Sequence, residues 1–319
     1  MADIDWAQQL LNGLFAGSAY ALFAVGYTLI FGVLDILNLA HQAIYMLGAF
    51  CALALVTGNV AGLGSLPGGL QLPFWLATLV AMLIAGLLGI LLDRVAFAPL
   101  RKRPDTHFSG MISSIAVTLI FEALAIWLFL PQRSQFPSGT IPAGAVTIGG
   151  GTLPYSRVLV IAAALVLVVA LTLLIRFTRL GKAIRAVAEN PKAARLLGIN
   201  VEGIYAFSFF LSSALGGAAG IFYGLAVSRL DPTMGRTVEL KGLAVIILGG
   251  MGSVPGAVLG GYILGLTEVV VVAVNNTSIF GITLTNTSNY RDAIAFVLLF
   301  LILVLRPTGL LGARRVREA

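Results

Sequence analysis

The sequence predicts an all-α fold, a polytopic membrane helix bundle, and three observations lead to it. Of 319 residues, 59% are hydrophobic and only 10% are charged, whereas a soluble domain carries about 25% charged residues. Apolar runs such as 159–175 and 293–305 belong to segments that approach the roughly 20 residues needed to cross a membrane. Glycines recur four residues apart in or beside other apolar segments, which favours closely packed helices.

Nine apolar elements are predicted, with boundaries uncertain by several residues. Two places complicate the count, because 237–251 is short and begins with Glu239 and Lys241, and Leu34 to His41 holds polar residues between two apolar runs. Either place could be a half-helix or a re-entrant turn, so eight to ten spans are predicted. The elements lie at about 8–31, 43–57, 72–93, 108–130, 157–176, 201–228, 237–251, 254–274 and 290–305.

The first element is expected to be a retained helix and not a signal peptide. Asp3 and Asp5 precede it where a basic n-region would stand, and it is too long for an h-region. Residues 1–319 are expected to form one transmembrane domain. The segments 131–156 and 275–289 are rich in Pro, Gly, Ser, Thr or Asn and are predicted to be extracytoplasmic loops.

The net charge of +7 is interpreted as an orientation signal and not as a nucleic-acid surface. The basic residues cluster in short loops between apolar segments, and such loops face the cytoplasm. The prediction is an N-terminus outside and a C-terminus in the cytoplasm. The residues concerned are Arg94, Arg101, Lys102 and Arg103; Arg176, Arg179, Lys182, Arg185, Lys192 and Arg195; and Arg306, Arg314, Arg315 and Arg317.

Small residues at four-residue spacing are expected to mark helix contacts, since close backbone packing drives association in lipid. This pattern supports a bundle without indicating a particular function. The glycines assigned to packing are Gly13, Gly17, Gly216, Gly220, Gly224, Gly252, Gly256 and Gly260.

No constellation of catalytic residues is found, so the chain is predicted not to be an enzyme. Two histidines and one cysteine give no metal-ligand spacing. The sequence has no G-x-x-x-x-G-K-[ST] loop and is expected to bind no cofactor itself. If ATP drives transport, it is expected on partner subunits.

The cytoplasmic loop at about 177–200 is predicted to be a compact helical elbow. Asn190 and Pro191 suit an N-cap and a first-turn proline, and Gly198 suits a C′ position. Two interpretations stay open: an ordinary basic loop, or a docking helix for a cytoplasmic partner. The residues assigned to coupling are Gly181, Lys182, Arg185, Ala186, Glu189, Asn190, Pro191, Ala193, Ala194, Leu197 and Gly198.

Polar residues within apolar segments are the other candidates. Asn38 and His41 are expected either to hold a helix break or to line a pathway, because polar groups at membrane depth face the bundle interior or a cavity. Glu122 and Glu268 are expected to have partners or to lie near helix ends. Asp231, Glu239 and Lys241 could contact a binding protein, but solvated helix ends are the preferred interpretation.

Four ordered segments resemble the branched-chain amino acid permease family of ABC importers, LivH type. They are the elbow, LLNGLFAGSAYALFAVGYTLIFGVLDILNLAH from Leu10, LGGMGSVPGAVLGG from Leu248 and YRDAIAFVLLFLILVLRPTGLLG from Tyr290. Where the family usually has Asn-Phe-Ala-His-Gly, this chain has Leu39 and Gln42, which puts the substrate identity in doubt. Gln42 therefore joins Asn38 and His41 as a candidate for lining the pathway.

The resemblance implies a bacterial inner-membrane permease that forms half of a pathway for branched-chain or other hydrophobic amino acids. It implies a second permease (LivM-like, or this chain itself), two cytoplasmic ATPases, an extracytoplasmic binding protein and surrounding lipid. On this basis Ala193 and Ala194 are expected to sit against an ATPase groove that Leu196 and Leu197 fill. The alternatives are a urea or short-amide permease of the same superfamily, or a stand-alone secondary transporter.

Overall fold

A computed structural model of the chain describes residues 5–67, 70–102, 106–274, 277–279, 282–284 and 290–312. Among the basic residues of the predicted cytoplasmic loops, Arg103, Arg314, Arg315 and Arg317 lie outside these described residues.

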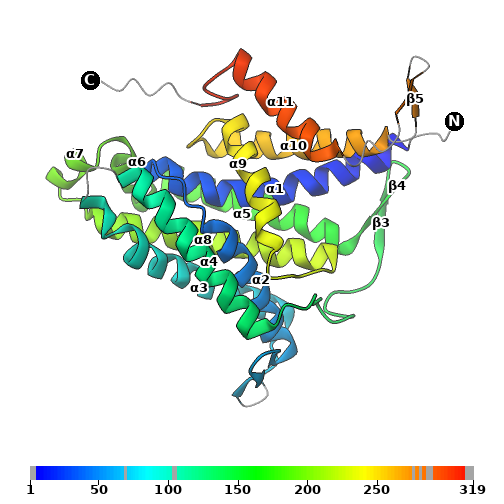
Figure 1. The fold of residues 1–319 in the computed structure, drawn as a ribbon, viewed down its shortest axis with the longest axis horizontal. Helices are drawn as coiled ribbons and strands as arrows, with labels where there is room; N and C mark the ends of the chain where they lie inside the picture. The colour runs from blue at the N-terminus through cyan, green and yellow to red at the C-terminus, as the bar shows by residue number, and fades with distance from the viewer. Residues whose placement is uncertain are drawn as a thin grey trace.

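Each of the nine predicted apolar elements coincides with an α-helix, which confirms the helix-bundle fold (Figure 1). The boundaries differ from the predicted ones by at most a few residues. The corresponding helices are α1 Trp6–Leu34, α2 His41–Thr57, α3 Phe74–Leu92, α4 Thr106–Phe129, α5 Tyr155–Phe177, α8 Val201–Val227, α9 Met234–Gly249, α10 Val254–Ala273 and α11 Arg291–Leu305.

Shorter elements connect these helices. A π-helical turn, η2 Asp93–Phe97, and a 3-10 turn, η3 Leu100–Lys102, follow α3, and α6 Arg179–Glu189 and α7 Pro191–Leu196 stand between α5 and α8. Three antiparallel hairpins lie in loops: β1 Asn59–Val60 with β2 Gly64–Ser65, β3 Ala145–Ile148 with β4 Gly151–Pro154, and β5 Thr277–Ile279 with β6 Ile282–Leu284. The last two fall within the segments predicted to be extracytoplasmic loops.

Among the described residues, six helices are long and apolar enough to cross a membrane: α1, α3 extended through Phe97, α4, α5, α8 and α10. The remaining apolar helices are shorter, with 17 residues in α2, 16 in α9 and 15 in α11. The helices α1, α5, α8 and α10 run roughly along the long axis of the molecule, and α9 runs steeply across α1 (Figure 1). The total of eight to ten spans and the orientation of the termini stay predictions.

The longest helix contact joins α1 and α10 through small residues. A methyl group added at Gly17 would come within 2.8 Å of the Cα of Tyr262, and one added at Gly265 within 2.3 Å of the backbone nitrogen of Gly17. At Gly13 it would meet Leu266 at 2.6 Å. Because the two backbones approach this closely, α1 and α10 form a continuous pair on one side of the bundle.

Helix α8 packs against α1, α2, α3 and α5, and its glycines allow backbone and rings of α2 to come close. A methyl group at Gly220 would lie 1.9 Å from the carbonyl oxygen of Tyr45, and one at Gly216 would lie 2.6 Å from the His41 ring. Gly224 faces Leu230, which follows α8. The small residues of α8 therefore allow the first turns of α2 to reach the interior of the bundle.

The predicted packing glycines Gly252, Gly256 and Gly260 do not all lie on one helix face. Gly252 lies in the turn before α10 with a φ of +84°, while Gly256 and Gly260 lie within α10. A methyl group at Gly256 would meet the carbonyl oxygen of Gly249 at 2.2 Å, and one at Gly260 would meet that of Val245 at 2.5 Å. Gly256 and Gly260 thus hold α10 against α9, whereas Gly252 lies against Gly32 of α1.

Candidate functional site: the elbow and the polar interior

The predicted elbow is built from two short helices, with starts and stops that follow from its sequence. Thr178 caps α6 by accepting a hydrogen bond from the Gly181 amide (3.0 Å). Asn190 caps α7 in the same way, accepting from Ala193 (3.0 Å), and Pro191 occupies the first turn. Gly198 follows α7 with a φ of +82°, a left-handed conformation that favours glycine.

The turn from α5 into α6 requires a residue without a side chain. A methyl group at Gly181 would lie 2.3 Å from the carbonyl oxygens of both Leu174 and Ile175. Arg185 of α6 donates a hydrogen bond to the same Ile175 carbonyl. The elbow is therefore fixed to the end of α5 by backbone packing and by a cationic side chain.

The elbow buries one face against the chain and exposes the other. Ile184, Val187 and Ala194 are buried in the hydrophobic core, with Ala194 only 2% exposed. Leu196 and Leu197 are 89% and 80% exposed. Of the other residues assigned to coupling, Ala186 is half-buried and the following are exposed: Lys182, Arg185, Glu189, Asn190, Pro191, Ala193 and Gly198.

The burial of Ala194 corrects one expectation from the sequence. The sequence places Ala194 against a partner groove, but α7 turns this side chain toward its own chain. The reason is packing: α7 lies against α6 and α8, and Ala194 is on the side of α7 that joins this core. The outward apolar surface of the elbow is formed by Leu196 and Leu197.

Charged contacts connect the elbow to the helices of the bundle. Glu202, in the first turn of α8, pairs with Arg195 of α7 (3.8 Å) and with Arg101 of η3 (2.6 Å). Arg101 also pairs with the buried Asp93 of η2 and lies over the Tyr205 ring, 4.2 Å from its centroid. These contacts tie the elbow, the start of α8 and the turns that follow α3 together.

Between α1 and α2 the chain breaks its helix inside the bundle. Asp35 ends α1 in the left-handed conformation (φ +56°). Asn38, 1% exposed, accepts a hydrogen bond from the Ala40 amide (3.2 Å). Leu39 is held from α4, because Ser114 accepts from its amide (3.2 Å) and Thr118 donates to its carbonyl (3.1 Å). The break is therefore an ordered turn packed against α4.

His41 begins α2 as a fully buried side chain. Its ring lies 4.8 Å from the ring centroid of Phe23 and 5.5 Å from that of Tyr27. Methyl groups at Gly26 or Gly216 would meet the ring at 3.1 and 2.6 Å. His41 thus sits between α1 and α8, about midway along α8, while its neighbour Gln42 is half-buried.

The charged groups within the apolar helices form specific pairs. Glu122 of α4 accepts two hydrogen bonds from Arg236 of α9, at 3.0 and 2.5 Å. Glu268 of α10 pairs with Lys241 of α9 (2.8 Å) and accepts from the Tyr20 hydroxyl of α1 (2.8 Å). The expectation that both glutamates have partners is confirmed.

The interpretation of Glu239 and Lys241 as solvated helix ends is wrong. Both residues are buried, with 4% and 9% exposure, because α9 begins against the interior turn of α2. A methyl group at Gly235 would lie 2.5 Å from the Gln42 carbonyl oxygen. The sequence analysis also did not identify Arg236 as a partner of Glu122 or Tyr20 as a partner of Glu268. Opposite charges in neighbouring apolar segments could have indicated the first of these pairs.

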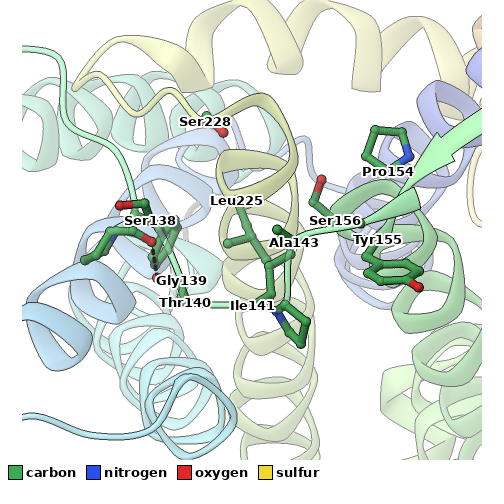
Figure 2. A pocket seen from close by; sticks show the side chains of 14 residues that line it. Ser138, Gly139, Thr140, Ile141, Ala143, Pro154, Tyr155, Ser156, Leu225 and Ser228 are labelled. Atoms are coloured by element: carbon green, nitrogen blue, oxygen red, sulfur yellow. Dashed lines mark hydrogen bonds between the residues drawn. The ribbon is translucent and has the colours of Figure 1, made fainter.

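A separate pocket of about 280 Å³ lies beside the far end of α8, among residues that no sequence motif indicates (Figure 2). Its walls come from the loop 136–144, from Pro154 to Ser156 and from Leu225 and Ser228. Thr140 donates to the Pro137 carbonyl (2.6 Å) within this loop. The elbow and the polar interior contribute no residue to this pocket.

Comparison with known proteins identifies relatives across almost the full chain. Residues 9–303 match the family described as "Branched-chain amino acid transport system / permease component". The chain is 33% identical to the high-affinity branched-chain amino acid transport system permease protein BraD of Pseudomonas aeruginosa, covering 98% of each. It is 31% identical to LivH of Escherichia coli, a permease protein of the same description, covering 98% of this chain and 97% of LivH.

More distant proteins also match. A probable branched-chain amino acid transport permease protein LivH of Methanocaldococcus jannaschii is 28% identical over 98% of this chain and 94% of its own. A chain in the structure of PsaBC from Streptococcus pneumoniae in complex with a Fab aligns with 92% of this chain and 94% of its own, at 14% identity and a TM-score of 0.45. The sequence relatives are membrane transport permeases and not enzymes.

Proposed function

The chain belongs to the branched-chain amino acid transport permease family, and from this premise we propose that it forms half of a solute pathway in an ABC importer. It is a multi-pass membrane permease subunit, with six helices of spanning length among the described residues. The proposal places it in the bacterial inner membrane with a second permease, which is a LivM-like chain or another copy of itself. Two ATPases and an extracytoplasmic binding protein complete the assembly.

One observation carries the proposed coupling to ATP: the capped helix α7 ends in two exposed leucines. Leu196 and Leu197 are 89% and 80% exposed in a basic segment that also holds Lys182, Arg185 and Lys192. Protein interfaces concentrate their binding energy in a few buried anchors. We expect these leucines to enter an ATPase groove, and the Arg195–Glu202–Arg101 contacts to pass the movement into α8 and α3.

The proposed substrates are branched-chain or other hydrophobic amino acids, because the relatives at 31–33% identity carry that description. A urea or short-amide permease of the same superfamily is the alternative that the departure at Leu39 and Gln42 leaves open. A stand-alone secondary transporter predicts uptake without an ATPase. Uptake of leucine, urea and acetamide by vesicles with and without ATP separates these functions.

The coupling proposal is tested by replacing both exposed leucines with glutamate, Leu196→Glu and Leu197→Glu. We expect at least tenfold weaker capture of the co-expressed ATPase, with folding of the chain retained because neither side chain packs in the core. The matched control is Leu63→Glu, an exposed leucine beside the β1–β2 hairpin. Full ATPase capture and full substrate-stimulated ATP hydrolysis by the double variant would show that the elbow is an ordinary loop.

Orientation is tested at an exposed lysine of the elbow. With Cys51 replaced by serine, Lys192→Cys should react with a membrane-impermeant maleimide in inside-out vesicles and not in intact cells. Labelling in intact cells would place the elbow outside and would remove the basis for ATPase docking.

A further inference from the structure

Three glutamates are buried within the apolar helices of the described chain, and one of them differs from the other two. Glu122 pairs with Arg236, and Glu268 pairs with Lys241. Glu239 is 4% exposed and forms no ion pair with a described residue. An ionisable group at membrane depth is costly unless it is paired or takes part in function, so Glu239 requires an explanation that the other two do not.

Glu239 lies where two short helices begin inside the bundle. Gly235 brings the first turn of α9 against the Gln42 carbonyl in the first turn of α2. The Glu239 carboxylate faces the backbone of Gln42 and the hydroxyl of Tyr27. A helix N-terminus supplies only about half an elementary positive charge, so the carboxylate keeps the capacity to bind a full cation.

Neutral oxygen acceptors accompany this carboxylate. The hydroxyl of Tyr27, the side-chain oxygen of Gln42 and both oxygens of Glu239 are buried without a hydrogen bond of normal geometry to a described residue. Buried polar atoms are nearly always hydrogen-bonded, and these atoms come from α1, α2 and α9. The Tyr27 hydroxyl faces the Glu239 carboxylate, and Gln42 meets α9 one turn earlier, where a methyl group at Gly235 would lie 3.2 Å from the Gln42 Cβ. Together these residues outline a site that accepts hydrogen bonds from a group that the described residues do not supply.

Residues next to Glu239 are exposed at the surface of the chain. Gln42 is half-buried, and Arg236, one turn before Glu239 on α9, has a side chain that is 60% exposed although its partner Glu122 is buried. Charged side chains within the bilayer face water or protein rather than lipid. We therefore expect the open side of α9, with Arg236 and Thr237, to face the water-filled pathway and not the acyl chains.

We propose that Glu239 binds the primary ammonium group of the amino acid that this permease carries, with Tyr27 and Gln42 as neutral acceptors. An ammonium group has three N–H donors and a full positive charge, which suits one carboxylate and two neutral oxygens. The paired glutamates Glu122 and Glu268 cannot serve in this way, because arginine and lysine already occupy them. This inference rests on the proposed amino-acid transport.

The test is chemical protection of Glu239 in the wild-type permease complex. A hydrophobic carbodiimide modifies carboxyl groups within membranes, and mass spectrometry measures the modified fraction of Glu239, with Glu122 and Glu268 as internal references. We expect leucine to slow modification of Glu239 at least threefold. We expect no protection by 4-methylpentanoate, which has the same side chain and carboxylate without the ammonium group, and none by sodium chloride.

Each other outcome of the protection test contradicts the proposal. No protection by leucine excludes an ammonium contact. Equal protection by 4-methylpentanoate shows that the aliphatic chain alone is sensed, and protection by sodium without leucine shows an alkali-cation site. Wild-type vesicles that take up no leucine would instead refute the proposed function, so the two failures are distinguishable.

Variants give a second, independent measurement. Glu239→Gln should reduce leucine uptake at least tenfold with subunit assembly at the wild-type level, and Glu239→Asp should restore part of the uptake. Wild-type uptake by Glu239→Gln would overturn the proposal. If Glu239→Gln does not assemble, Tyr27→Phe is measured instead. The proposal expects this variant to have a raised KM for leucine uptake, and an unchanged KM would contradict it.

Discussion

The interior turn between α1 and α2 and the elbow between α5 and α8 are both interruptions of long helices, but their exposure is opposite. In the interior turn the polar residues Asn38 and His41 are buried. In the elbow the apolar residues Leu196 and Leu197 are exposed. Each region thus places side chains where burial energetics alone would not put them.

The physical feature that indicates function therefore differs between the interior and the surface. Inside a bundle, a buried polar group must find protein partners or serve a ligand. On an aqueous surface, an ordered helix with adjacent exposed leucines favours a protein partner. The comparison predicts that substitutions in the interior turn affect folding first, whereas substitutions on the outward face of the elbow affect assembly with partners.

The largest effect is expected where α8 meets α2. Gly220→Leu must push the Tyr45 carbonyl away, since even a methyl group would approach it to 1.9 Å. Overpacking of this kind should cost above about 3 kcal/mol and abolish a monodisperse peak in size-exclusion chromatography. Gly32→Ala is the control, because its methyl group would make an ordinary 3.4 Å contact with Gly252. Equal behaviour of the two variants would contradict the packing of α2 against α8.

The next effect separates the two faces of the elbow. Ala194→Glu places a charge at a position that is 2% exposed and should cost about 2–3 kcal/mol through desolvation. Thermal unfolding in detergent should therefore shift to lower temperature. The exposed neighbour Ala193→Glu serves as control and should unfold like the wild type. If Ala194→Glu unfolds normally and only loses the ATPase, then Ala194 faces the partner after all.

A smaller effect is expected at the interior turn. Asn38→Leu removes the acceptor of the Ala40 amide, and leaving that buried donor unsatisfied should cost about 1–3 kcal/mol. Expression and transport should then fall together, while Asn38→Ser should recover part of both. Normal expression with altered substrate preference would support a pathway-lining role, and unchanged behaviour in both would dismiss both roles.

The smallest effect is expected at the cap of α7. Asn190→Ala removes the side chain that accepts from the Ala193 amide and should cost about 1 kcal/mol. Local amide exchange in α7 should accelerate, with global stability almost unchanged. Asn200→Ala, the matching cap of α8, should not accelerate exchange in α7, and if it does, the two helices unfold as one unit.

The elbow shows what sequence could predict and what it could not. Its helices, its Asn190 cap and its Gly198 stop follow from local rules, because capping depends on residues three or four positions apart. The direction in which Ala194 points depends on packing against elements far away in the chain, and here the expectation was wrong. The same holds for Glu239 and Lys241, which look like helix-end charges in sequence and are buried beside α1, α2 and α10.

The helix bundle, the positions of its nine apolar helices and the family follow from the sequence alone, because apolar length, glycine spacing and ordered motifs are local properties of the chain. The pairing of the glutamates becomes visible only in the folded molecule. Glu122 and Arg236 are 114 positions apart in the chain, and Tyr20 and Glu268 are 248 apart. Such contacts depend on how the helices cross, and no local pattern specifies that. Charge pairing at membrane depth depends on which helices lie side by side in the folded chain, whereas helix formation depends on residues that are close in the sequence.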